Sequence, residues 1–104
     1  PRPLTLRLME RHPISSQVFM PLEPAPLVVV VAPAGKAPRP EDIRAFLTDG
    51  RQGINYATGT WHHPLLALAD AAFLVIDRTG PGMRFNQDYD EVTYPGVTMT
   101  VVLA

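Results

Sequence analysis

The sequence has no cysteine, no long apolar run and no surplus of charge of one sign. The absence of cysteine among the 104 residues excludes disulfide frameworks and thiolate metal sites. The longest apolar run, Leu27–Ala32, is far too short to cross a bilayer. Nine basic and ten acidic residues give a formal net charge of −1, with no basic cluster. We therefore expect no nucleic-acid partner and no membrane partner, and we take a cytoplasmic location as the default.

The composition is typical of one globular domain with many turns. Hydrophobic residues make up 46% of the chain, which is enough for one core. Twelve prolines and seven glycines are scattered between the apolar runs, as in an all-β chain. The chain begins at Pro1 and runs straight into a strand-like pattern. We expect a single domain over residues 1–104 that lacks an N-terminal portion of the natural protein.

Alternation of apolar and polar residues predicts a series of short strands. Leu4, Leu6 and Leu8 alternate with more polar neighbours, which is the period of a strand. Residues 27–31 are apolar on both faces, which predicts a central strand covered on both sides. Further strands are predicted at residues 16–22, 53–56, 65–69, 73–78, 91–94 and 97–103, with turns at 58–59, 79–82 and 95–96.

Residues 40–47 are the one segment with a helical pattern. Pro40 and two acidic residues stand where a helix N-terminus favours them, and the apolar residues that follow have helical spacing. About eight strands and one short helix predict a sandwich or a closed barrel. Among such folds, the jelly roll of the cupins leaves an interior pocket.

Two of the three histidines are adjacent and follow the only tryptophan, Trp61. In an extended segment, His62 and His63 must point to opposite faces. An imidazole that faces into a small barrel needs a partner, a ligand or a metal. We expect His62 to face inward, and His63 to face outward and to brace a loop or a dimer contact.

The spacing of other polar residues matches that of metal-binding cupins. Glu10, His12 and Gln17 stand where the first cupin motif has two histidines and an acid, and Gly59 and His62 match the second motif. The strand pleat places Glu10 and His12 on one face. The sequence thus predicts a site for a hard or borderline divalent metal, although Gln17 would be a weak neutral ligand.

Each of these residues also has a structural interpretation. His12 could be a strand-end histidine bonded to backbone, and Glu10 could pair with a neighbouring arginine. Gln17 could be an ordinary hydrogen-bond donor, and Trp61 could belong to the core.

Seven blocks of the chain together resemble the ureidoglycolate lyases of allantoin breakdown, also known as ureidoglycolate hydrolases. These blocks are residues 9–13, 17–22, 28–32, 43–50, 52–56, 60–65 and 73–78. The resemblance implies a cupin-like β-barrel, a homodimer, and cleavage of (S)-ureidoglycolate to glyoxylate and urea. Some members of the family are associated with nickel, so the resemblance also implies a divalent metal of this kind. The chain departs from the family at Ala57, where members often carry histidine, and the family's N-terminal polar motif has no counterpart here.

The implied reaction assigns roles to particular residues. Glu10, His12 and His62 are candidates for the proton transfers, and we expect burial to raise the pKa of the carboxyl group. Arg78 or a metal would hold the substrate carboxylate.

The remaining candidates for substrate binding are Asn55, Tyr56, Trp61 and His63, the first two of them toward the ureido group. Two other classes of function stay open: a small cupin that binds a metabolite or a divalent metal without catalysis, and a different cupin enzyme acting on a small hydroxy acid.

Overall fold

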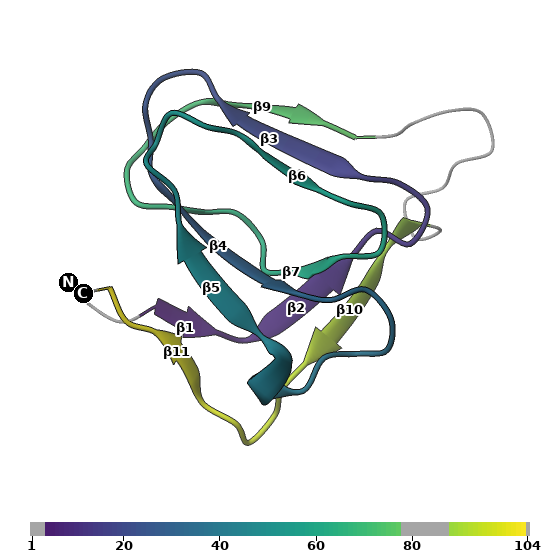
Figure 1. Ribbon diagram of the computed structural model, residues 1–104. Coiled ribbons are helices and arrows are strands. Elements are labelled where there is room, and N and C mark those ends of the chain that lie inside the picture. Colours follow the sequence, from purple (N-terminus) through teal and green to yellow (C-terminus); the bar gives the residue numbers. More distant parts are fainter. Residues whose placement is uncertain (1–3, 78–87, 104) are drawn as a thin grey trace.

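The computed structural model describes residues 4–77 and 88–103, and nearly all of its regular structure is β-strand (Figure 1). The strands are β1 (Leu4–Leu6), β2 (Leu8–Arg11), β3 (Gln17–Pro21), β4 (Leu27–Ala32), β5 (Arg44–Leu47), β6 (Ile54–Tyr56), β7 (Trp61–His62), β8 (Leu66–Ala67), β9 (Phe73–Ile76), β10 (Asp90–Thr93) and β11 (Met99–Val101). The predicted turn at residues 79–82 lies outside the described residues. No helix among the described residues is long and apolar enough to span a membrane.

The strands form three antiparallel sheets. The largest has the order β10-β2-β7-β4-β5, with β8 also paired to β4. A three-stranded sheet has the order β6-β3-β9, and β1 pairs with β11 near the two chain ends (Figure 1). This arrangement confirms the predicted all-β class and is consistent with a cupin-like β fold.

Strand β4 is the centre of the core, as its unbroken apolar sequence predicted. Val28, Val30 and Ala32 pack with Met9 and Trp61 in one buried cluster. The alternate residues Leu27 and Val29 pack with Tyr56 in a second cluster. Because successive side chains of a strand point to opposite faces, β4 contributes to both clusters.

The predicted helix over residues 40–47 is wrong. Only Pro40–Asp42 is helical, as a short 3-10 turn, η1, and the chain then becomes extended at Ile43, with φ −87° and ψ 136°. Asp42 accepts a hydrogen bond from the Arg39 backbone N–H at 3.0 Å, which closes the turn. The following residues form β5, because the edge of β4 offers a ladder from Val28 to Val31. A long-range pairing here overrides the local helical pattern.

Strand β7 is short, and its pairing places His62 next to Glu10, where the sequence predicted the site. It lies between β2 and β4, with His62 opposite Glu10 on one side and opposite Val31 on the other. A turn at Gly59, with φ of 80°, precedes it, and the Gly59 N–H donates to the His12 carbonyl at 2.9 Å. Glycine suits this positive φ, because a side chain would be strained there. The turn therefore ties β7 to the end of β2.

Candidate functional site

The structure brings together three of the predicted site residues, Glu10, His12 and His62. One ligand atom from each lies within 4.8 Å of the others. Glu10 belongs to β2, His12 follows the end of that strand, and His62 comes from β7. Gln17, at the start of β3, also contacts His12. We call Glu10, His12, Gln17 and His62 the polar cluster.

His62 faces inward, as predicted, and is only 1% exposed. Its Nδ1 lies 3.0 Å from the Thr60 carbonyl oxygen, which can only accept a hydrogen bond. Nδ1 therefore carries a hydrogen, and in the neutral ring Nε2 keeps a lone pair. Nε2 is buried and has no hydrogen-bond partner in the described part of the chain. Its nearest charged neighbour is Oε1 of Glu10 at 3.6 Å, which is too long for a hydrogen bond.

His12 is held in the same way. Its Nδ1 lies 2.9 Å from the Asp88 carbonyl oxygen, so Nδ1 is again the donor. Its Nε2 faces Oε1 of Gln17 at 3.1 Å. The rings of His12 and His62 lie with their centroids 5.2 Å apart. Both imidazoles are thus oriented by a backbone carbonyl and direct Nε2 into the polar cluster.

Glu10 is ionised in this environment, contrary to the expectation that burial raises its pKa. Burial does act in that direction, but the close approach of the His62 imidazole, the hydrogen bond from Tyr89 and attraction from His12 outweigh it and lower the pKa of Glu10. The Tyr89 hydroxyl donates to Oε2 of Glu10 at 2.9 Å and also lies 2.6 Å from Oε1 of Glu91. Burial and the two carboxylates raise the pKa of Tyr89, so the phenol remains a donor.

Gln17 connects the polar cluster to Asp77. The Gln17 side chain is largely buried, and its Nε2 donates to Oδ1 of Asp77 at 2.8 Å. The sequence offered no signal for this contact, nor for those of Tyr89 and Asp88. The predicted carboxylate-binding residue Arg78 lies outside the described residues.

Trp61 and His63 do not join the polar cluster. Trp61 is 3% exposed and packs in the core, where its Nε1–H donates to the Gly35 carbonyl oxygen at 3.1 Å. The backbone N–H of His63 donates to the Val30 carbonyl, and its Nδ1 lies 2.8 Å from the Pro64 carbonyl oxygen. These contacts are structural ones.

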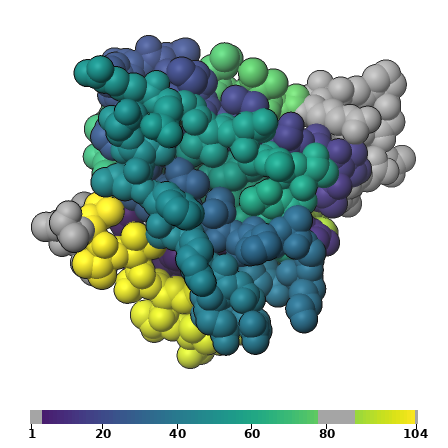
Figure 2. Space-filling model, viewed as in Figure 1, coloured from purple at the N-terminus to yellow at the C-terminus, as the bar shows by residue number. Residues whose placement is uncertain are grey.

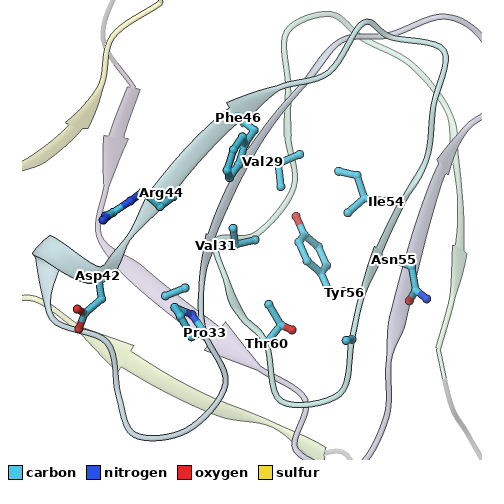
Figure 3. Close-up of a pocket in the computed structure, with 12 residues that line it drawn as sticks. Val29, Val31, Pro33, Asp42, Arg44, Phe46, Ile54, Asn55, Tyr56 and Thr60 are labelled. Atoms are coloured by element: carbon cyan, nitrogen blue, oxygen red, sulfur yellow. The ribbon is translucent and has the colours of Figure 1, made fainter.

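Tyr56 contacts the polar cluster and also lines a cavity of about 640 Å³. Its ring stacks on His62, with centroids 4.2 Å apart and an interplanar angle of 10°. Its hydroxyl points toward the cavity, among Val29, Phe46 and Ile54 (Figure 3). Burial, with a smaller effect from Glu10, raises the pKa of Tyr56 to about 12, so the hydroxyl stays protonated.

The cavity is bounded mainly by β4, β5 and β6. The teal part of the chain, which includes β5 and β6, forms much of the face shown in the space-filling view (Figure 2). Thr60 adds a polar side chain to its lining. Asn55 also borders the cavity, but its side chain is turned away from Tyr56 (Figure 3). The predicted pair Asn55 and Tyr56 therefore both line one cavity. Its volume falls in the range of small-molecule sites.

Known proteins with similar sequences indicate the family of this chain. Residues 1–101 match the family model described as Ureidoglycolate lyase. The chain is 57% identical over 90 residues to the ureidoglycolate lyase of Azotobacter vinelandii (strain DJ), covering 86% of this chain and 54% of that relative. It is 49% identical over 90 residues to that of Pseudomonas syringae pv. syringae (strain B728a), covering 86% and 53%. It is 51% identical over 88 residues to that of Pseudomonas paraeruginosa (strain DSM 24068 / PA7), covering 84% and 52%. The chain thus spans about half the length of these curated relatives.

Proposed function

Because the chain belongs to the ureidoglycolate lyase family, we propose that it cleaves (S)-ureidoglycolate to glyoxylate and urea. The observation that supports this most directly is the convergence of the partly buried Glu10 and His12, at the end of β2, with the buried His62 of β7. Carboxylate and imidazole groups are the usual carriers of protons in enzymes. With the activity we propose its setting, namely a role in allantoin and purine breakdown in the cytoplasm.

The reaction moves two protons and consumes no water. The hydroxyl O–H of ureidoglycolate loses its proton as the oxygen forms a carbonyl, the carbon–nitrogen bond breaks, and the departing urea nitrogen gains a proton. The lowered pKa of Glu10 keeps its carboxylate ionised, so that it has a free lone pair for the hydroxyl proton. In the cluster without a bound metal, either imidazole, once protonated at Nε2, is suited to protonate the leaving nitrogen.

The polar cluster fits a divalent metal. The buried Nε2 of His62 has a lone pair without a hydrogen-bond partner among the described residues, and Nε2 of His12 and the Glu10 carboxylate lie close to it. Each imidazole donates its other N–H to a backbone carbonyl, which is the usual support of a metal-bound histidine. Glu10, His12 and His62, with Gln17 as a weaker fourth donor, would hold the ion, and the nitrogen and oxygen set suits a borderline metal such as nickel. When bound, such an ion would act as a Lewis acid toward the substrate carboxylate and hydroxyl.

The cavity is the place we propose for the ureido end of the substrate. Tyr56 directs a protonated hydroxyl toward it, and Asn55 lines it. A phenol can donate a hydrogen bond to the oxygen of a urea group or accept one from its nitrogen. The contacts of Trp61 and His63 favour structural roles for these two residues.

We also propose that the chain forms a homodimer, as the family resemblance implies. Phe46 and Leu47 on the edge strand β5 are each 59% exposed. Large apolar side chains on an open strand edge favour association with another surface. Sedimentation equilibrium of the purified protein should give twice the mass of the chain, and a monomer would contradict this proposal.

One assay tests the activity. The purified full-length protein is incubated with (S)-ureidoglycolate, with and without added Ni²⁺, and urea, glyoxylate and ammonia are measured. We expect equal amounts of urea and glyoxylate. Ammonia as the main nitrogen product would indicate hydrolysis instead. No turnover by the folded protein would favour a cupin that only binds its ligand.

A further inference from the structure

The orientation of the Gln17 amide is fixed by Asp77. A glutamine amide has a donor end and an acceptor end, and its neighbours determine which way it faces. The Asp77 carboxylate only accepts, so the Gln17 amino group must face it, at 2.8 Å. Oε1 of Gln17 therefore faces Nε2 of His12, at 3.1 Å.

In this orientation, the lone pair of His12 Nε2 faces a lone pair of Gln17 Oε1. Nδ1 of His12 donates to the Asp88 carbonyl, so Nε2 of the neutral ring has no hydrogen to offer Gln17. The two atoms attract each other only through a positive species, which is either a second proton on His12 or a cation. The 3.1 Å between these two acceptor atoms would suit two donor atoms that hold one cation together.

Without the Asp77 carboxylate, the amide could turn over. Its amino group would then donate to Nε2 of His12 in an ordinary neutral hydrogen bond. That bond would occupy the His12 lone pair and turn the Gln17 oxygen away from the polar cluster. A hydrogen bond to a carboxylate is stronger than a neutral one, so Asp77 opposes this rotation.

We propose that Asp77 is a positioning residue, which holds the Gln17 amide with its oxygen inward and so makes Gln17 the fourth donor atom for a divalent cation. This inference rests on the metal site of the proposed function. It adds a residue from β9's C-terminal end, beyond the ligands themselves, that sets the affinity of the site for the ion.

The test is the affinity of the full-length protein, stripped of metal, for Ni²⁺ by isothermal titration calorimetry. Asp77→Asn keeps the shape but allows either orientation of the amide, so we expect affinity to fall about 10–100-fold. Asp49→Asn is the matched control, because Asp49 is also exposed and its Oδ1 accepts a hydrogen bond from the Arg51 backbone N–H, away from the polar cluster. It removes the same charge and should change affinity less than about twofold. Thermal unfolding of each variant checks that it folds.

A second pair of variants, made in the Gln17→Glu protein, distinguishes the effect of amide orientation from the effect of the Asp77 charge. A glutamate at position 17 presents oxygen whichever way it turns. In the Gln17→Glu background, Asp77→Asn should therefore cause no loss of Ni²⁺ affinity. An equal loss in both backgrounds, or no loss in the native one, would overturn the role of Asp77 while leaving the metal site intact. A wild-type protein that binds no Ni²⁺ would overturn both this inference and the metal site, and the product assay without added metal would still judge the lyase activity on its own.

Discussion

Tyr56 contacts two regions that are built in opposite ways. Its ring stacks on His62 of the polar cluster, where the histidines, the glutamate and the glutamine are each held by a hydrogen bond on their outer side. Its hydroxyl points toward the cavity, whose lining is largely aliphatic and aromatic. The polar cluster is preorganised, because its atoms have little freedom to turn, whereas the cavity provides volume and a few polar contacts. Under the proposed function, the proton transfers belong to the polar cluster, and the uncharged end of the substrate belongs to the cavity.

The largest effect is expected from removing the imidazole of His62. His62→Ala should lower the turnover of ureidoglycolate about 10²–10⁴-fold, because it deletes a buried group poised to transfer a proton or hold a metal. Steady-state kinetics measure the loss, and thermal unfolding confirms that the variant folds.

His63→Ala is the comparison for that variant. His63 makes hydrogen bonds only with the backbone carbonyls of Val30 and Pro64 among the described residues. We therefore expect His63→Ala to keep most of the activity. If His62→Ala and His63→Ala lowered turnover equally, the reaction would not take place at the polar cluster.

Trp61 should matter for stability instead of turnover. It is 3% exposed in the core cluster beside β4, so Trp61→Ala should lower the free energy of unfolding by about 3–5 kcal/mol. Urea denaturation at equilibrium measures this loss. Turnover per folded molecule at low temperature should be nearly unchanged. Normal stability with lost turnover would instead make Trp61 a substrate platform.

Features of the molecule that depend on a few neighbouring residues could be predicted from the sequence. The apolar run of β4 and the two-residue spacing of Glu10 and His12 are local properties, and both predicted what the structure shows. So did the alternation that turns His62 inward. Each of these depends only on the period of a strand.

The parts that were missed depend on distant segments. Tyr89 lies 79 residues from Glu10, and Asp77 lies 60 residues from Gln17. No local pattern reports such contacts, because they arise from the pairing of β10 with β2 and of β9 with β3. The false helix over residues 40–47 has the same origin, since its pairing partner β4 is elsewhere in the sequence.

Tyr56→Phe separates the two regions most directly. The variant keeps the ring that stacks on His62 and removes only the hydroxyl directed at the cavity. Loss of one neutral hydrogen bond to the substrate should raise KM about 2–10-fold. The affinity for Ni²⁺ should stay the same, because the polar cluster is untouched. A loss of metal affinity with an unchanged KM would place the function of the hydroxyl in the polar cluster instead.

The smallest effect is expected at the rim of the cavity, where Asp42 is paired with Arg39. Hydrogen bonding from Arg39 holds the pKa of Asp42 below its ordinary value. A carboxyl group whose pKa is lower in the folded state stabilises the fold above its unfolded pKa, and this contribution disappears as the pH falls through the folded pKa. Asp42→Asn should therefore be slightly less stable than the native chain at pH 7, and the difference should vanish in acid below the folded pKa. The pair is exposed, so the effect should be small and weaker in high salt. Urea denaturation of both proteins at neutral and acidic pH measures it, and a change in turnover at pH 7 would show that the cavity rim also takes part in recognition.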